Sequence, residues 1–278
     1  MHQYIFPLVF LIGCSGKSTD DSATSNDSTD STDTNDTNDT NDTNDTNTEP
    51  TASFTGSLEF VDGTEISSSS VRVQMCLGSC YIAILEGNTF TFPALTAGTY
   101  AFDVVPLAGG GERNYATPID FIEITTDVET HSLTQSVQIN AFATVSDPIS
   151  SGSISADGDL TIEVDASGFT PREGFEDFTF LSSVRVDPAT NGLPLDSLPE
   201  DIVGMWQLGA FEAHISPSWS FSVANSELLP GTQLRVFNAS YDDIMWKEVG
   251  TATVDDNGII HSDDGTGIEI LSAIVLTQ

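Results

Sequence analysis

The stretch that decides the fold is residues 89–100, Thr-Phe-Thr-Phe-Pro-Ala-Leu-Thr-Ala-Gly-Thr-Tyr. Phe90 and Phe92 alternate with threonines, which places both rings on one face of an extended strand. A second alternating run begins at Tyr100, and Gly98 lies between the two runs as a turn residue. The stretch therefore predicts a hairpin of two half-buried, aromatic-rich β-strands.

The sequence around this hairpin continues the same pattern. After Pro50 no segment keeps the 3.6-residue period of a helix, and short alternating runs are separated by Gly, Asn, Asp and Pro. The clearest of these runs are residues 71–75, 100–104, 160–164 and 219–223. Residues 194–200 allow one helical turn at most. We therefore predict an all-β protein, in which two β-sandwich modules follow a disordered N-terminal linker.

We place the boundary between the modules near residue 142, which gives a module at 51–141 and a second at 142–278. The first resembles the prealbumin-like or carboxypeptidase-regulatory-like β-sandwich, an Ig-like fold, through residues 56–60, 71–73 and above all 89–100. Two positions depart from that family's pattern, because Asn88 replaces a glycine and Val71 replaces a small residue. The resemblance implies a fold and no activity.

The second module resembles one that recurs in large bacterial surface proteins. The resemblance covers about 50 residues and is carried by segments 229–236, 246–254, 256–258 and 263–268. It implies no catalytic role. Read physically, the aromatic and β-branched residues of 246–254 fill a sandwich face, and Asp-Asn-Gly at 256–258 makes a tight turn.

The first fourteen residues read as an export signal. Residues 4–12 form an apolar run that is too short to span a membrane. Leu11-Ile12-Gly13-Cys14 resembles the lipobox of bacterial lipoproteins, which implies lipid on Cys14 and cleavage before it. In lipoproteins of this kind an aspartate after the cysteine is the signal for retention in the inner membrane. The resemblance therefore implies that a chain with Ser15 there goes to the outer membrane or cell surface of a Gram-negative bacterium. The alternative is a chance cysteine after an ordinary signal peptide.

Residues 15–50 are almost entirely Ser, Thr, Asp and Asn, with a Thr-Asn-Asp triplet repeated through 34–48. Such a segment has no apolar surface to bury, so we expect a disordered, acidic spacer. Three alternatives remain: calcium binding, O-glycosylation of threonines, and N-glycosylation at Asn-Asp-Thr triplets.

The charge balance limits the partners. The chain has 42 acidic and 7 basic residues, a formal net charge of −35, and 38% hydrophobic residues. It therefore lacks the basic surface that nucleic acids require. The expected contact with the membrane is through lipid at Cys14, and the other expected partner is a surface protein or polysaccharide.

Few residues point to chemistry. Cys76 and Cys80 bracket a three-residue turn, and we expect a structural disulfide there rather than a zinc or redox site. No histidine pair has metal-ligand spacing, and we expect no cofactor and no metal. After cleavage before Cys14, which removes His2, the remaining histidines are His131, His214 and His261, and they are isolated from one another. The acidic clusters are 157/159, 173/176/177, 242/243, 255/256 and 263/264, of which the turns at 255–264 are the best calcium candidates.

The tryptophans give the last indication. Trp206, Trp219 and Trp246 together would make a sugar-stacking platform if exposed, and Trp206 has the least decided context. We expect core positions for the other two. The sequence thus favours a non-enzymatic cell-surface lipoprotein for display, adhesion or envelope structure. The alternatives are a carbohydrate-binding lipoprotein using exposed aromatics or a calcium-assisted site, and an enzyme with a dispersed site.

Overall fold

The computed structural model describes residues 49–199, 201–224 and 226–278. The export signal, Cys14 and residues 15–48 of the linker lie outside the described residues. The segment Thr48–Gln278 is one compact unit. In the part of the chain that is described, no helix is long and apolar enough to cross a membrane.

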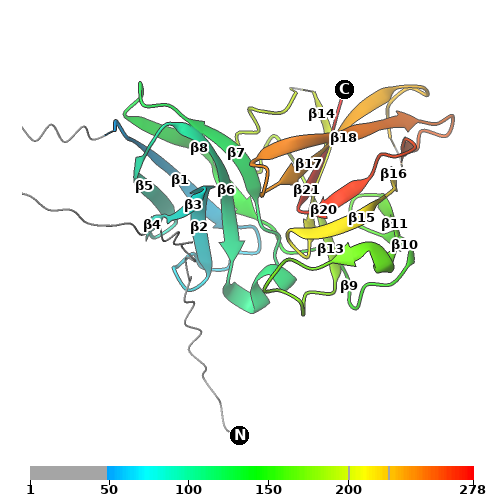
Figure 1. Cartoon of the computed structure of the whole chain (residues 1–278), viewed down its shortest axis with the longest axis horizontal. Helices are drawn as coiled ribbons and strands as arrows, with labels where there is room; N and C mark the ends of the chain where they lie inside the picture. Colours follow the sequence, from blue (N-terminus) through cyan, green and yellow to red (C-terminus); the bar gives the residue numbers. More distant parts are fainter. Residues whose placement is uncertain (1–48, 200, 225) are drawn as a thin grey trace, which may run out of the picture. The chain divides into compact units, whose positions relative to one another are not determined.

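Two four-stranded sheets form from the residues before 142 (Figure 1). The first, in spatial order, consists of β4 (Ile84–Glu86), β5 (Thr89–Leu95), β1 (Ala52–Phe60) and β8 (Thr130–Ile139). The second consists of β3 (Ser79–Ile82), β2 (Val71–Leu77), β6 (Gly98–Pro106) and β7 (Ile119–Ile124). All pairs are antiparallel except β1 with β8, which run parallel.

The residues after 142 form a ten-stranded and a three-stranded sheet. The large sheet has the order β10 (Gly152–Ser155), β11 (Leu160–Val164), β16 (Phe221–Val223), β19 (Ile260–Ser262), β18 (Met245–Val254), β17 (Gln233–Ser240), β21 (Ala273–Thr277), β14 (Ile202–Gly209), β13 (Leu181–Val186) and β9 (Thr144–Ser146). The small sheet has the order β12 (Phe169–Thr170), β15 (Ala213–Trp219) and β20 (Ile268–Leu271). Every residue of β21 is buried between its neighbours β17 and β14.

These sheets confirm the predicted all-β fold. Helical structure in the described residues is limited to two short 3₁₀ segments, η1 (Ala108–Arg113) and η2 (Ala166–Gly168). Strands up to Ile139 and strands from Thr144 do not share a sheet, yet residues of both groups contribute to one hydrophobic cluster. Phe121 of β7 and Trp246 of β18 meet edge to face within it, with ring centroids 6.0 Å apart.

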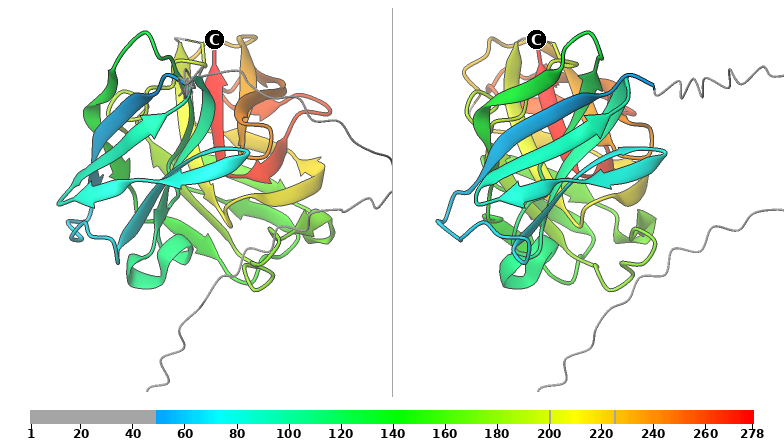
Figure 2. Two further views of the ribbon diagram at one scale, coloured as in Figure 1. Left: turned by 60° about the vertical axis from the view of Figure 1, so that its left-hand side comes forward. Right: turned by 90° about the vertical axis from the view of Figure 1, so that its left-hand side faces the viewer.

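The hairpin predicted from residues 89–100 and the run that follows at 100–104 is wrong in one respect. β5 pairs with β1 and β4, whereas β6 pairs with β2 and β7, so the turn before Gly98 carries the chain from one sheet to the other (Figure 2). The reason is the aromatic faces of both strands, which bury each other only when the strands face one another. Phe90 of β5 and Phe102 of β6 pack with ring centroids 5.6 Å apart, and both are fully buried.

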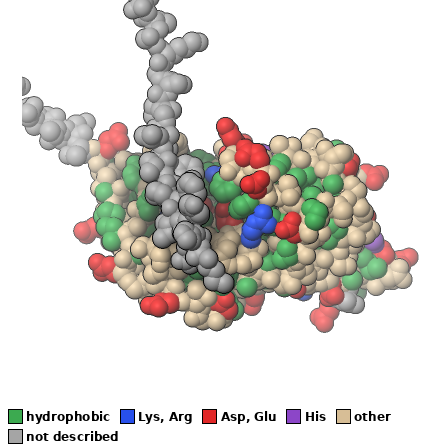
Figure 3. Space-filling view, turned by 90° about the horizontal axis from the view of Figure 1, so that it is seen from below, with side chains coloured by type: hydrophobic (Ala, Val, Ile, Leu, Met, Phe, Trp, Pro, Cys, Tyr) green, Lys and Arg blue, Asp and Glu red, His purple; other side chains and the backbone are tan. Residues whose placement is uncertain are grey.

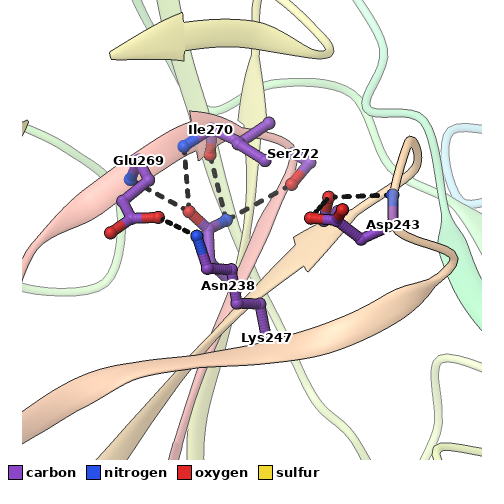
Figure 4. A network of polar contacts seen from close by, with 7 residues as sticks. Asn238, Asp243, Lys247, Glu269, Ile270 and Ser272 are labelled. Carbon is purple, nitrogen blue, oxygen red and sulfur yellow. Dashed lines mark hydrogen bonds and ion pairs between the residues drawn. The ribbon is translucent and has the colours of Figure 1, made fainter. Parts of the chain in front are cut away.

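A single asparagine joins the large sheet to the small one (Figure 4). The Asn238 side chain is 1% exposed; its Nδ2 donates to the carbonyls of Ile270 and Ala273 and to Ser272 Oγ. Its Oδ1 accepts from the backbone N–H groups of Glu269 and Ile270. Because every polar group of this buried amide is paired, it stabilises the connection between β17 and the β20–β21 segment.

Candidate ligand-binding groove

A hollow with both apolar and polar lining side chains lies where β7, β8 and the 188–196 loop meet. It has a volume of about 500 Å³. A second cavity of about 360 Å³ adjoins it, because Ile122, Glu123, Pro194 and Asp196 line both. The two cavities together make one groove, called here the β7–β8 groove.

The groove is open because β8 is an edge strand that is only partly covered. The loop seals its second half, where Gln138 N–H donates to the Asn191 carbonyl at 2.9 Å. Gly192 fits against β8 only without a side chain, since a Cβ there would lie 2.1 Å from the Ser136 carbonyl oxygen. The pairing of β8 with β1 shifts register between Ser132 and Ser136, and this bulge lies beside the uncovered half.

The floor of the groove is apolar and its wall is polar. Phe54, Ile122 and Leu193 are buried at the floor. The carboxylates of Glu123 and Asp196 are exposed at the neck between the two cavities. No lysine or arginine is among the residues that line either cavity in the described chain. The groove therefore favours a neutral or cationic ligand that donates hydrogen bonds.

The one histidine of the groove is engaged in a structural contact. His131 Nε2 donates to the Thr125 carbonyl at 2.9 Å. Within the described residues, neither Ser132 nor Thr134 hydrogen-bonds to this ring. The groove thus presents hydrogen-bonding groups without a nucleophile and base in contact.

The cysteine prediction is confirmed. Cys76 and Cys80 form a disulfide at the end of the β2–β3 hairpin, where they are directly opposite each other across the two strands. Cys14, the predicted lipidation site, lies outside the described residues, and its lipidation stays a prediction.

All three tryptophans are buried. Trp206, Trp219 and Trp246 are 1%, 1% and 5% exposed, and each indole N–H donates to an oxygen of an aspartate. Arg185 covers the Trp206 ring at 5.6 Å, although the ring borders a smaller cavity. Stacking of a sugar needs an exposed indole face, which Trp206 does not present. The candidate ligand-binding role of this residue therefore has no geometric support, because β14 turns the ring into the core.

The aspartates of the turns at 255–264 accept hydrogen bonds from neighbouring groups of the chain. Asp255 accepts from the N–H groups of Ile259 and Asn257 at 2.8 Å, and these bonds hold the pKa of its carboxyl below the usual value. Thr251 Oγ1 donates to Asp263. Across the described ranges, no three His, Cys, Asp or Glu side chains are grouped so that they hold a metal ion. The other two histidines are about half exposed; His214 lies 3.9 Å from Asp242 and His261 lies 3.4 Å from Asp255.

Sequence reasoning missed a group of buried carboxyls between the two sets of strands. Asp103 of β6 is 1% exposed, and burial raises its pKa to about 7, although the hydrogen bond from Gln74 Nε2 lowers it. Glu212 follows β14 in the chain, and burial raises its pKa to about 8, although the hydrogen bond from Tyr241 N–H lowers it. Asp103 Oδ1 and Glu212 Oε2 have no hydrogen-bond partner among the described residues.

Arg172 lies beside these carboxyls and offsets part of their burial cost. Its guanidinium is within 6 Å of the ring centroids of Phe175, Phe211 and Tyr241. Its charge lowers the pKa of both Asp103 and Glu212, although burial outweighs this effect. On the face drawn in Figure 3, carboxylates are spread over the surface and basic side chains are few. Two of the chain's seven basic residues, Arg72 and Arg172, act on this buried group.

A third buried carboxyl, Asp120 of β7, is fully paired. Its Oδ1 accepts from Phe121 N–H at 2.8 Å and from Trp246 Nε1 at 3.0 Å, and its Oδ2 accepts from Leu195 N–H at 2.7 Å. Burial raises the pKa of Asp120 to about 6, and the bond from Trp246 opposes the rise. One side chain therefore connects strands from both sides of residue 142. The only sequence signal was the polar alternation on β6 and β7, which is equally typical of a solvent-facing strand.

Comparison with known proteins yields little. No family model matches the chain, and no curated protein matches it. One similar solved structure is a DUF3823 family protein from Bacteroides ovatus, with 10% identity, coverage of 81% of this chain and 79% of that chain, and a TM-score of 0.23. Another is fervidolysin from Fervidobacterium pennivorans, a keratinolytic enzyme related to subtilisin, with 13% identity, coverage of 83% and 31%, and a TM-score of 0.23. At these TM-scores neither match bears on fold or function.

Proposed function

We propose that this chain is a non-enzymatic binding protein of a Gram-negative cell surface, held to the outer membrane by lipid on Cys14. The Leu11–Cys14 resemblance supports the anchor, and the acidic composition of residues 15–50 supports a spacer. The body beyond the spacer holds a ligand in the β7–β8 groove.

The observation that carries the binding role is the combination of an apolar floor with a wall of uncharged and acidic groups. The ligand that fits these groups best is a neutral, hydroxyl-rich glycan segment. Carboxylates such as Glu123 and Asp196 accept hydrogen bonds from sugar hydroxyls, and the apolar floor packs against the C–H face of a sugar ring. Anionic glycans are disfavoured because the chain carries a net charge of −35.

The test is calorimetric titration of the full chain with a panel of neutral oligosaccharides of glucose, mannose, galactose and N-acetylglucosamine. We expect at least one to bind, and Glu123→Gln with Asp196→Asn to weaken it about tenfold, about 1.4 kcal/mol. Glu86→Gln, an exposed carboxylate outside the groove, is the matched control and should leave binding unchanged.

Two results contradict the proposal. If no neutral glycan binds and a lysine-rich peptide does, the groove accepts cationic polypeptide and the ligand class is wrong. If the double variant and Glu86→Gln bind a glycan equally well, the glycan lies elsewhere on the surface.

A further inference from the structure

The chain exposes an apolar edge in a second place. Leu77, Tyr81, Ile82 and Ile84 are 42%, 40%, 54% and 55% exposed, although each is a large hydrophobic side chain. Leu77 ends β2, Tyr81 and Ile82 belong to β3, and Ile84 begins β4; all four residues of β3 are exposed. Residues 77–84 are called here the β3–β4 strip, which lies in front in the right-hand view of Figure 2.

Both strands of the strip are at the edges of their sheets. Among the described strands, β3 pairs only with β2, and β4 pairs only with β5. Ala83 N–H donates to the Val73 carbonyl at 3.0 Å, which places Ala83 in the ladder with β2. Because groups alternate along an antiparallel strand, the backbone N–H and C=O of Ile82 and Cys80 point to the open side.

The strip lacks the protection that edge strands normally carry. Natural edges are blocked by charges, prolines or bulges, which prevent pairing with another chain. In contrast, residues 73–85 contain no charged side chain and no proline, in a protein with 42 acidic residues. The disulfide between Cys76 and Cys80 also fixes the β2–β3 hairpin, so the edge is ordered before any partner arrives.

Acidic residues lie just after the strip in the chain and next to a tyrosine that contacts it. Glu86 ends β4. Within the strip, Cys80 Sγ lies 3.3 Å from the Tyr241 hydroxyl, and Asp242 and Asp243 follow Tyr241 in the chain. A partner that covers the uncharged strip therefore meets negative charge beyond it.

We propose that the β3–β4 strip is a docking site for an extended strand of another protein, apolar on alternate residues and flanked by lysine or arginine. The partner strand adds to β3 through backbone hydrogen bonds and covers the side chains of Ile82 and Ile84. Its basic ends pair with the bordering carboxylates. A second copy of this chain fits less well, because each copy brings a net charge of −35 and the same acidic borders.

The test uses a fluorescent peptide, Lys-Thr-Ile-Thr-Val-Thr-Ile-Lys, titrated with the full chain and followed by anisotropy. We expect saturable binding, and about tenfold weaker binding when glutamate replaces both lysines. Methylation of alternate peptide N–H groups removes backbone pairing without changing the side-chain pattern, and should abolish binding. If the methylated peptide binds as well as the parent peptide, the contact is not strand addition.

Variants of the protein locate the site. Ile82→Lys places a charge on the edge and should weaken binding of the peptide about tenfold. Val61→Lys is the matched control, because Val61 is also 54% exposed and lies outside the strip, and it should leave binding unchanged. Ile82→Pro removes one N–H on the open side and should act like Ile82→Lys; if it fails to fold, the lysine variant still decides.

Three outcomes overturn the proposal. The first is that the peptide does not bind to the wild-type chain. The second is that Ile82→Lys and Val61→Lys weaken binding of the peptide equally. Alternatively, sedimentation shows a concentration-dependent dimer of the wild-type chain that Ile82→Lys dissociates, in which case the occupant is a second copy. None of these outcomes depends on whether the β7–β8 groove binds a glycan.

Discussion

Replacing Asp120 with asparagine separates the hydrogen bonds of this buried carboxyl from its charge. Oδ1 of an asparagine still accepts from Phe121 N–H and Trp246 Nε1, but its amide NH₂ faces Leu195 N–H, a second donor. A buried N–H that loses its acceptor costs about 1–3 kcal/mol. Asp120→Asn should therefore lower the free energy of unfolding by about 2 kcal/mol where the wild-type carboxyl is protonated.

The negative charge of Asp120 destabilises the fold, so the stabilising effect of its hydrogen bonds is partly cancelled as pH rises and the carboxyl ionises. Burial raises the pKa of Asp120 to about 6 in the folded protein, from an ordinary value of 3.8, so the folded state binds more protons than the unfolded state between these values. The contribution of Asp120 to stability is therefore greatest below about pH 4 and falls as pH rises through about 6. The full loss is about 3 kcal/mol, and about half of it falls between pH 5 and 8.

Urea unfolding at pH 5 and pH 8 measures this loss of stability, and both pH values lie above the isoelectric point of about 4.1. The destabilisation caused by Asp120→Asn should shrink by about 1–2 kcal/mol from pH 5 to pH 8. Asp256→Asn, at an exposed position, is the control for the general loss of a negative charge. If the destabilisation by Asp120→Asn is the same at both pH values, Asp120 does not couple folding to protonation.

Three further changes have defined outcomes. Replacing Cys76 and Cys80 with serine should lower the unfolding free energy by about 2 kcal/mol, the value for a five-residue loop, and alkylation without reductant should leave both wild-type cysteines unmodified. Gly192→Ala should destabilise the protein by several kcal/mol in urea unfolding, since its Cβ would lie 2.1 Å from the Ser136 carbonyl oxygen at a φ of +79°, and unchanged stability would mean that the loop moves away from β8. Cys14→Ala should release the protein from the membrane fraction, and a variant that stays with membranes after a high-salt wash would show another anchor.

The strands were predictable from the sequence because alternation depends on neighbouring residues alone. Residues 71–75, 100–104 and 160–164 lie within single strands as expected. The run 219–223 is divided, because Trp219 ends β15 of the three-stranded sheet and residues 221–223 form β16 of the ten-stranded sheet. Which strands pair was not predictable in the same way. The turn before Gly98 is compatible both with a hairpin and with a crossing between sheets, and only the facing aromatic rings of distant strands decide between them.

The candidate site was less accessible to sequence reasoning. His131 and Asp196 both line the groove but are 65 positions apart in the sequence, and no local pattern connects them. Asp103 illustrates the related difficulty. Its alternation with Phe102 and Val104 predicted a polar face toward solvent, yet residues after 142 cover that face and bury the carboxyl.

The position of β21 bears on when this protein is able to fold. It is the last strand in chain order, yet it lies between β17 and β14 near the middle of the ten-stranded sheet. Until residues 273–277 are in place, β17 and β14 each expose a row of unpaired backbone groups, and the sheet remains in two halves. A chain that emerges from its N-terminus cannot close this sheet early. The ten-stranded sheet therefore becomes one continuous unit only when β21 inserts between β17 and β14, so the joint stability of its two halves depends on a segment that is made late.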